Sequence, residues 1–128
     1  MLSVCDPEIQ QDDGVTVEVF KSFLAGFGCK IYRVAEGKVF RIPAGKAHAH
    51  GNIDILYPVS GEIWIAFADA KGQVFKQCLE SGKVYLIPPN VLHQVEIRGG
   101  VLETFFPTSI YIKTIPMRYL EGGFFSRG

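Results

Sequence analysis

The chain contains three histidines, His48, His50 and His93, and their positions indicate that they could share one chemical site. His48 and His50 are separated by one alanine, and Asp54 follows four residues after the second of them. Because side chains alternate between the faces of a β-strand, an unbulged strand would project these three even-numbered side chains to one side. His93 lies on the apolar face of the strand-like segment VLHQVEI, which we expect to face the core.

Three imidazoles and a carboxylate form a ligand set that suits a divalent transition metal. We therefore expect one ion of Fe, Mn, Ni, Cu, Co or Zn, bound by His48, His50, Asp54 and His93. Strands hold such ligands rigidly and leave coordination positions open, as a catalytic metal site requires. The alternatives are that His48 and His50 are surface residues of a strand, that His93 is a hydrogen-bonded core histidine, and that Asp54 faces water.

The elements that must position these residues are predicted to be β-strands. Short runs rich in Val, Ile, Phe and Tyr are separated by Gly, Pro, Asp and Asn, which is typical of an all-β fold. A tight turn is predicted at DAKG, residues 69–72, and such turns imply antiparallel neighbours. We predict strands at 15–20, 30–34, 38–42, 47–58, 62–68, 73–79, 83–87, 91–97, 101–106 and 109–115.

The C-terminal region carries the only helical signal in the chain. Pro116 could start a helical turn within residues 116–123, or the Gly-rich end could be a loose tail. About ten short strands must avoid leaving unpaired edges, and a sandwich, a jelly roll and a closed barrel each achieve this. The length of 128 residues and the 48% hydrophobic content predict one domain over residues 1–128.

Composition argues against several classes of partner. Thirteen basic residues balance thirteen acidic ones, so we expect neither nucleic acid nor a membrane surface as a partner, but a small molecule. Three scattered cysteines, without a C-x-x-C pair, are predicted to be reduced thiols. Without a signal-like segment or a run of roughly 20 apolar residues, we expect a cytoplasmic protein.

Two segments resemble the paired motifs of the cupin superfamily. Residues 48–61 read H-A-H-x-x-x-D-x-x-x-x-x-x-G, similar to the first motif, in which H-x-H is followed by Glu and then Gly. Residues 82–93 read G-K-V-Y-L-I-P-P-N-V-L-H, similar to the second motif, in which Gly, Pro, Gly and His recur at this spacing. The resemblance covers about residues 30–107 and uses every histidine of the chain.

The resemblance implies a double-stranded β-helix, also described as a small jelly-roll barrel, with the metal inside and a homodimer as the assembly. Asp54 stands where the family usually has Glu, so its shorter carboxylate could bind the metal directly, bind it through water, or act as a base. Asn90 replaces a motif glycine, which is a mild change because Asn tolerates a left-handed turn. Ile42 and Ile97 also depart from the family pattern.

The expected function is that of a metal-binding cupin, most simply an enzyme. Its substrate would be a sugar, a sugar acid or a short carboxylic acid, and its chemistry that of an isomerase, a lyase or a dioxygenase. The alternatives are a non-catalytic binding or sensor module, with or without a structural metal, and a metal-free jelly roll. Trp64 is expected to pack or to line the pocket, and the other candidate pocket residues are Tyr57, Tyr85, Gln94, Glu96 and Glu103.

Overall fold

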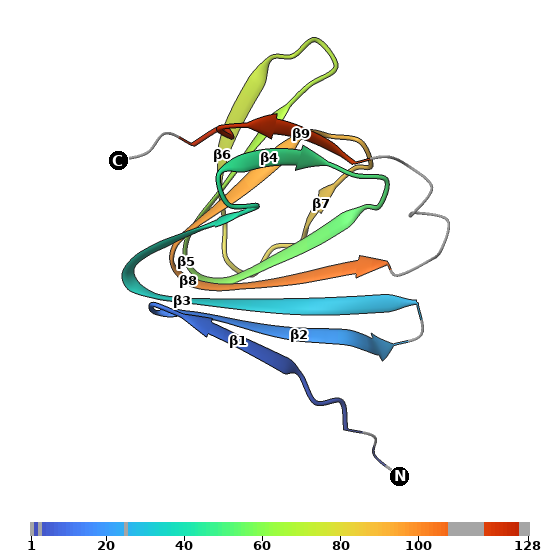
Figure 1. Ribbon diagram of the computed structural model, residues 1–128, viewed down its shortest axis with the longest axis vertical. Helices are drawn as coiled ribbons and strands as arrows, with labels where there is room; N and C mark the ends of the chain where they lie inside the picture. Colours follow the sequence, from blue (N-terminus) through green and yellow to red (C-terminus); the bar gives the residue numbers. More distant parts are fainter. Residues whose placement is uncertain (1, 3, 25, 108–116, 126–128) are drawn as a thin grey trace.

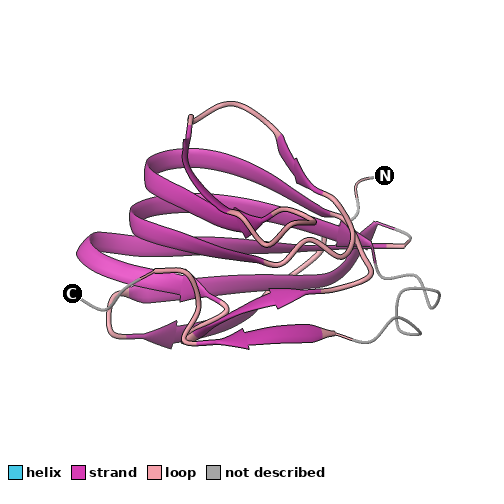
Figure 2. Cartoon of the chain, turned by 90° about the horizontal axis from the view of Figure 1, so that it is seen from above, coloured by secondary structure: helices cyan, strands magenta, loops and turns pink. Residues whose placement is uncertain are grey.

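The computed structural model describes residues 2, 4–24, 26–107 and 117–125 (Figure 1). Within these residues the chain forms strands joined by turns, and the cartoon of the described part contains no helix (Figure 2). The prediction of an all-β fold is therefore confirmed. The strands are β1 (Glu8–Asp12), β2 (Val15–Leu24), β3 (Phe27–Ile42), β4 (Lys46–Ala49), β5 (Asp54–Ala68), β6 (Val74–Leu79), β7 (Tyr85–Ile87), β8 (His93–Pro107) and β9 (Arg118–Glu121).

Strand β8 is the central strand of the fold. It pairs with β3 along one edge and with β5 along the other, and β4 also pairs with it at His93. The path β1-β2-β3-β8-β4-β9 accounts for six strands, while β5 connects β6 and β7 to β8. Every pairing is antiparallel, as the tight turns predicted. In Figure 1, β4 and β9 lie across the upper half of the molecule, above the layer formed by β1, β2 and β3.

The long strands β5 and β8 turn a corner together where glycines of the two strands meet. Gly61 pairs with Gly100, and both have positive φ angles, of 84° and 119°. A Cβ atom on Gly100 would lie 2.2 Å from the carbonyl oxygen of Ser60, so no larger residue fits there. Because the strands approach so closely, each can bend, and its two halves contribute to facing layers of the jelly roll.

The core lies between these layers and is formed by inward-facing side chains of β3, β5 and β8. Ile63, Ile97 and Leu102 are fully buried, and Tyr32 and Val95 pack in the same cluster. Alternation along β8 places His93, Val95 and Ile97 on this inner face, as predicted. His93 therefore projects from the same face of β8 as these core residues.

Several predicted strand boundaries are corrected by the structure. The predicted pairs 30–34 with 38–42, and 91–97 with 101–106, are single strands, β3 and β8, because their internal glycines mark corners and not chain turns. Conversely, the predicted strand 47–58 is two strands, because β4 ends at Ala49 and β5 begins at Asp54. The turn at 69–72 is confirmed, since the N–H of Gly72 donates to the carbonyl of Asp69 at 3.0 Å.

The chain ends differ most from the predictions. The proposed helical turn is wrong over Arg118–Glu121, which forms β9 and pairs with β4, so pairing with an available strand edge outweighs the local helical signal. β1 was not predicted, because its sequence EIQQD is polar and exposed along its whole length. The predicted strand 109–115 lies outside the described residues. The described part of the chain includes no helix long and apolar enough to cross a membrane.

Candidate metal centre

Three elements bring the four candidate ligands together. His48 is in β4 and stands opposite His93, the first residue of β8. On its other side His93 pairs with Phe67 of β5, so it lies between two neighbouring strands. His50 follows the end of β4, and Asp54 begins β5. The structure thus places all four predicted residues at one end of the jelly roll.

Asp54 reaches the histidines through a turn and not through strand alternation. The chain leaves β4 after Ala49 and returns as β5 at Asp54, so the predicted continuous strand is not what aligns these residues. The turn is anchored from the second motif, because the N–H of Asn90 donates to the carbonyl of His50 at 2.8 Å. Asn90 has a φ of 64°, the left-handed conformation expected where the cupin motif has glycine. The two motifs are therefore bonded to each other.

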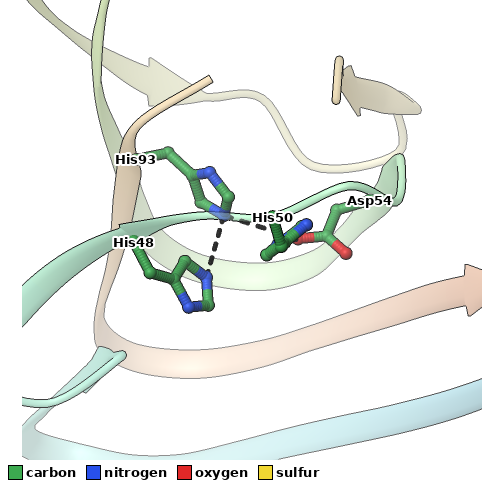
Figure 3. A group of neighbouring side chains, drawn as sticks. All are labelled: His48, His50, Asp54 and His93. Atoms are coloured by element: carbon green, nitrogen blue, oxygen red, sulfur yellow. Dashed lines mark hydrogen bonds and ion pairs between the residues drawn. The ribbon is translucent and has the colours of Figure 1, made fainter. Parts of the chain in front are cut away.

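The donor atoms of the four side chains converge on one point (Figure 3). His50 Nε2 lies 3.0 Å from Asp54 Oδ2, His93 Nε2 lies 3.4 Å from the same oxygen, and His48 Nε2 lies 3.1 Å from His93 Nε2. One ligand atom from each residue lies within 4.8 Å of all the others. Metal bonds of about 2.1 Å at angles between 90° and 110° separate neighbouring ligand atoms by about 3.0–3.4 Å. The three separations given above therefore match those between ligands of a single ion.

Backbone carbonyls orient two of the imidazoles. His50 Nδ1 lies 2.9 Å from the carbonyl of Asn52, and His93 Nδ1 lies 2.8 Å from that of Val91. A carbonyl only accepts, so both Nδ1 atoms donate, and in the neutral ring the lone pair is on Nε2, which faces the centre. The side chain of Asn52 donates to Asp54 Oδ1 at 3.3 Å, which leaves Oδ2 directed at the histidines. These contacts prepare the donors for a metal.

Burial and mutual contacts shift the pKa values of three of these groups. Burial, followed by the nearby His93 and His50, lowers the pKa of His48 to about 4, so this ring is neutral. Burial alone would raise the pKa of Asp54, but hydrogen bonds from His50 and His93 outweigh it and lower the pKa. For His50, burial lowers the pKa, and the hydrogen bond and charge of Asp54 raise it further than burial lowers it. The site thus holds its negative charge on the carboxylate.

No protein-family model and no curated protein sequence matches this chain. Its structure is similar to oxalate decarboxylase from Bacillus subtilis, with a TM-score of 0.64 and 14% identity over 94% of this chain and 32% of that one. A structure describing the substrate binding mode of oxalate decarboxylase gives a TM-score of 0.64 and 15% identity over 84% of this chain and 30% of that one. The chain has the cupin fold. It spans about a third of the length of these structures.

Beside the ligand cluster, the cupin jelly roll encloses a cavity of about 170 Å³. Its polar walls include Lys30, Tyr32, Asn52 and Thr104, none of which was predicted. Burial, and then the charge of Asp54, raise the pKa of Tyr32 to about 12, so its hydroxyl keeps its proton. Alternation in KIYRV does predict that Lys30 and Tyr32 share a face. Nothing in that segment shows that the face adjoins the histidines.

The other pocket candidates fall elsewhere in the cupin fold. Gln94 and Glu96 alternate with His93 and project from the opposite face of β8. Trp64 also lies outside the cavity, where its ring lies under the guanidinium of Arg98 at 5.4 Å. Tyr57, Tyr85 and Glu103 do not line this cavity among the residues that the structure describes.

Proposed function

We propose that this protein is a metal-dependent enzyme that acts on a small carboxylic acid. The metal would be one divalent transition ion held by His48, His50, Asp54 and His93. The observation that carries this proposal is the convergence of the four donor atoms, with two Nδ1 atoms anchored on carbonyls. Such an ion supplies Lewis acidity, and for iron, copper or nickel also redox chemistry, which covers lyase, isomerase and dioxygenase reactions.

The residues of the cavity support an acidic substrate. Among the described residues that line the cavity, Lys30 is the one lysine or arginine. Within the described part of the chain its ammonium makes no ion pair. A carboxylate entering the cavity would therefore meet Lys30 as well as the metal. The protonated hydroxyl of Tyr32 can donate a second hydrogen bond. The similar structures are of oxalate decarboxylase, whose name states that it acts on a small dicarboxylic acid.

Elemental analysis of purified protein tests the metal directly. After dialysis against a mild chelator, we expect close to one transition metal per chain in the wild type and a loss of at least about 100-fold in affinity in His93→Ala, because even the outer-shell partners of a ligand are worth 10–100-fold. Val95→Ala is the matched control, since Val95 lies two residues along the same face and is buried to a similar degree, 3% exposed against 2%. If all three proteins contain equally little metal, even after reloading with iron, manganese, nickel and zinc, the proposal is overturned.

A second candidate is a non-catalytic binding module. It is favoured by the observation that Asp54 is the only carboxylate among the described lining residues of the cavity. If Asp54 binds the metal, Lys30 and Tyr32 are left as acid–base groups. Proton NMR of metal-loaded protein with a panel of short carboxylic and 2-oxo acids separates the candidates. Conversion of any acid supports an enzyme, whereas line broadening without conversion supports a binding module.

We also propose that residues 1–128 form one domain. Strands from both ends of the chain, β1 and β9, belong to the same connected sheet, which supports this proposal. The homodimer and the cytoplasmic location remain predictions from the sequence.

A further inference from the structure

We propose that the acid carries an apolar chain or ring, and that this part lies in a groove between the β1–β2 hairpin and the C-terminal half of β3. The inference rests on the proposed function and narrows its substrate class to monocarboxylic acids with an aryl or alkyl substituent. The carboxylate would lie at the metal cavity, and the substituent would extend along β2.

The groove exists because one layer of the jelly roll is wider than the other. β1 and β2 extend the layer that contains the N-terminal half of β3, while the C-terminal half of β3 bends away to pair with Val95–Arg98 of β8. Figure 1 shows β1 and β2 at the bottom of the molecule, beyond the part covered by β4 and β9. The space between has a volume of about 780 Å³. That volume lies within the range of about 300–1,000 Å³ of small-molecule sites, whereas the metal cavity of about 170 Å³ lies below it.

The groove adjoins the metal cavity. Four residues, Lys30, Tyr32, Ile42 and Phe106, line both spaces. A molecule with its carboxylate beside the ligand cluster could therefore continue past these side chains into the groove. The metal cavity would hold only the reacting end of such a molecule.

The walls of the groove are suited to an apolar group. Val17 and Val19 of β2 line one side, and Phe40 lines the other, with its ring 5.9 Å from that of Tyr32. Phe106 is set close against β3, because a Cβ atom on Gly28 would lie 2.5 Å from its ring. Glycine at position 28 thus allows this aromatic wall. Burial of a substituent among these side chains would be favourable.

The charges around the groove indicate one anionic end only. Lys21 is paired with Glu8 at 3.2 Å, and Arg41 with Glu96 at 2.8 Å. Lys30, at the junction with the metal cavity, has no such pair within the described residues. A single carboxylate at the junction is therefore complementary, and a second charge farther along the groove would lack a comparable partner.

Calorimetric titration with propionate and 3-phenylpropionate tests the inference, because these acids share a head group and differ by one ring. We expect metal-loaded wild type to bind 3-phenylpropionate at least about tenfold more tightly, since a buried ring removes substantial apolar area from water. Phe40→Ala should reduce this ratio several-fold, and Lys30→Gln should weaken both acids equally. Val39→Ala is the control, because Val39 adjoins Phe40 but is 55% exposed and does not line the groove.

Each outcome is informative about a different claim. A ratio near one in the wild type, or a ratio unchanged by Phe40→Ala, overturns the inference. If sedimentation shows a dimer that Phe40→Ala dissociates, and the ratio is near one, the groove is a subunit contact and the inference is wrong. Titrations repeated on chelator-treated protein, together with its metal content, test the proposed function separately. A tenfold ratio in protein that binds no metal supports the groove and overturns the metal site.

Discussion

Each face of β8 buries a cluster of ionisable side chains, and the two clusters differ in how their polar atoms are paired. On the inner face, His93 joins His48, His50 and Asp54. On the outer face, three residues away, Glu96 is 3% exposed and accepts hydrogen bonds from two arginines, Arg41 and Arg98. Both clusters remove charge-bearing groups from water, yet we assign chemistry to only one of them.

The outer cluster is complete in itself. Burial raises the pKa of Glu96, but the hydrogen bonds and charges of Arg41 and Arg98 outweigh burial and lower it. Arg98 extends the cluster to Glu62 and lies over the ring of Trp64. Each carboxylate oxygen of Glu96 thus accepts a hydrogen bond from a different arginine, and these contacts pair its charge within the protein.

In the inner cluster the outer atoms bond to other parts of the protein, while the inner atoms contact one another. The Nδ1 atoms of His50 and His93 and Oδ1 of Asp54 have protein partners, while three Nε2 atoms and Oδ2 face one another. Imidazole nitrogens and a carboxylate oxygen arranged in this way suit a divalent transition metal. The comparison indicates that burial of charged groups does not by itself mark a functional site. The feature on which we base the proposed site is the convergence of four donor atoms.

Loss of Glu96 should have the largest effect on stability. Glu96→Ala leaves two guanidinium groups without their shared carboxylate, and we expect a loss of about 2–4 kcal/mol, somewhat below the cost for a fully buried pair because Arg98 is half exposed. Urea unfolding of chelator-treated protein measures this value. Glu62→Ala is the control, since this exposed partner of the same arginine should cost less than about 1 kcal/mol. Equal losses in both variants would contradict the distinction between the buried and the exposed carboxylate.

Loss of the Asn52 side chain should affect the inner cluster only. Asn52→Ala removes the donor that holds Asp54 Oδ1, and we expect metal affinity to fall by about tenfold, with no change in the unfolding temperature of metal-free protein. Titration with Co²⁺, followed by its visible absorption, reports both affinity and ligand geometry. Asn52→Asp places a second acceptor there and should not restore the wild-type spectrum. An unaltered spectrum and affinity in Asn52→Ala would show that Asp54 does not need this support.

The outer cluster should also produce the smaller, pH-dependent effect. The folded-state pKa of Glu96 lies below its ordinary value of 4.5, so its ionised form stabilises the fold above that value. As the pH falls below about 4.5 the unfolded chain binds the proton first, and the contribution is lost. The difference in unfolding free energy between wild type and Glu96→Gln should therefore be constant at neutral pH and shrink in acid. A difference that grows as the pH falls would reverse the sign and contradict the assignment.

Local patterns predicted the parts of this protein that depend on local periodicity. The alternation of apolar residues in VLHQVEI correctly placed His93, Val95 and Ile97 on the core face. Turn chemistry at 69–72 and at Asn90 was also predicted, because those conformations depend on the residues within the turn. The resemblance to the cupin motifs led to the fold, which the structural comparison confirms.

Other features depended on contacts between distant segments. From the sequence, Gly61 and Gly100 were interpreted as breaks between strands. Glycine is required at these positions because a different strand approaches closely, and the local sequence does not show that approach. Gln94 was expected among pocket residues, but it is 1% exposed on the outer face and accepts a hydrogen bond from the N–H of Phe124 at 2.7 Å. Its amide also donates to the carbonyl of Pro43 at 3.1 Å, so two distant segments hold this side chain on the outer face. Asn52 was missed because its role depends on a turn that the strand prediction did not contain.

The sequence by itself determined which chemistry was available: three imidazoles and a carboxylate at strand-compatible spacing within an all-β chain. Residue types and periodicity are local properties, so they can be read without knowing which strands are neighbours. Only the tertiary structure decided that these donors meet, by pairing His48 with His93 and returning the chain at Asp54. It also decided that Glu96, on the same strand, is paired with both Arg41 and Arg98. Both arrangements depend on distances across strands, and the register of strand pairing sets those distances.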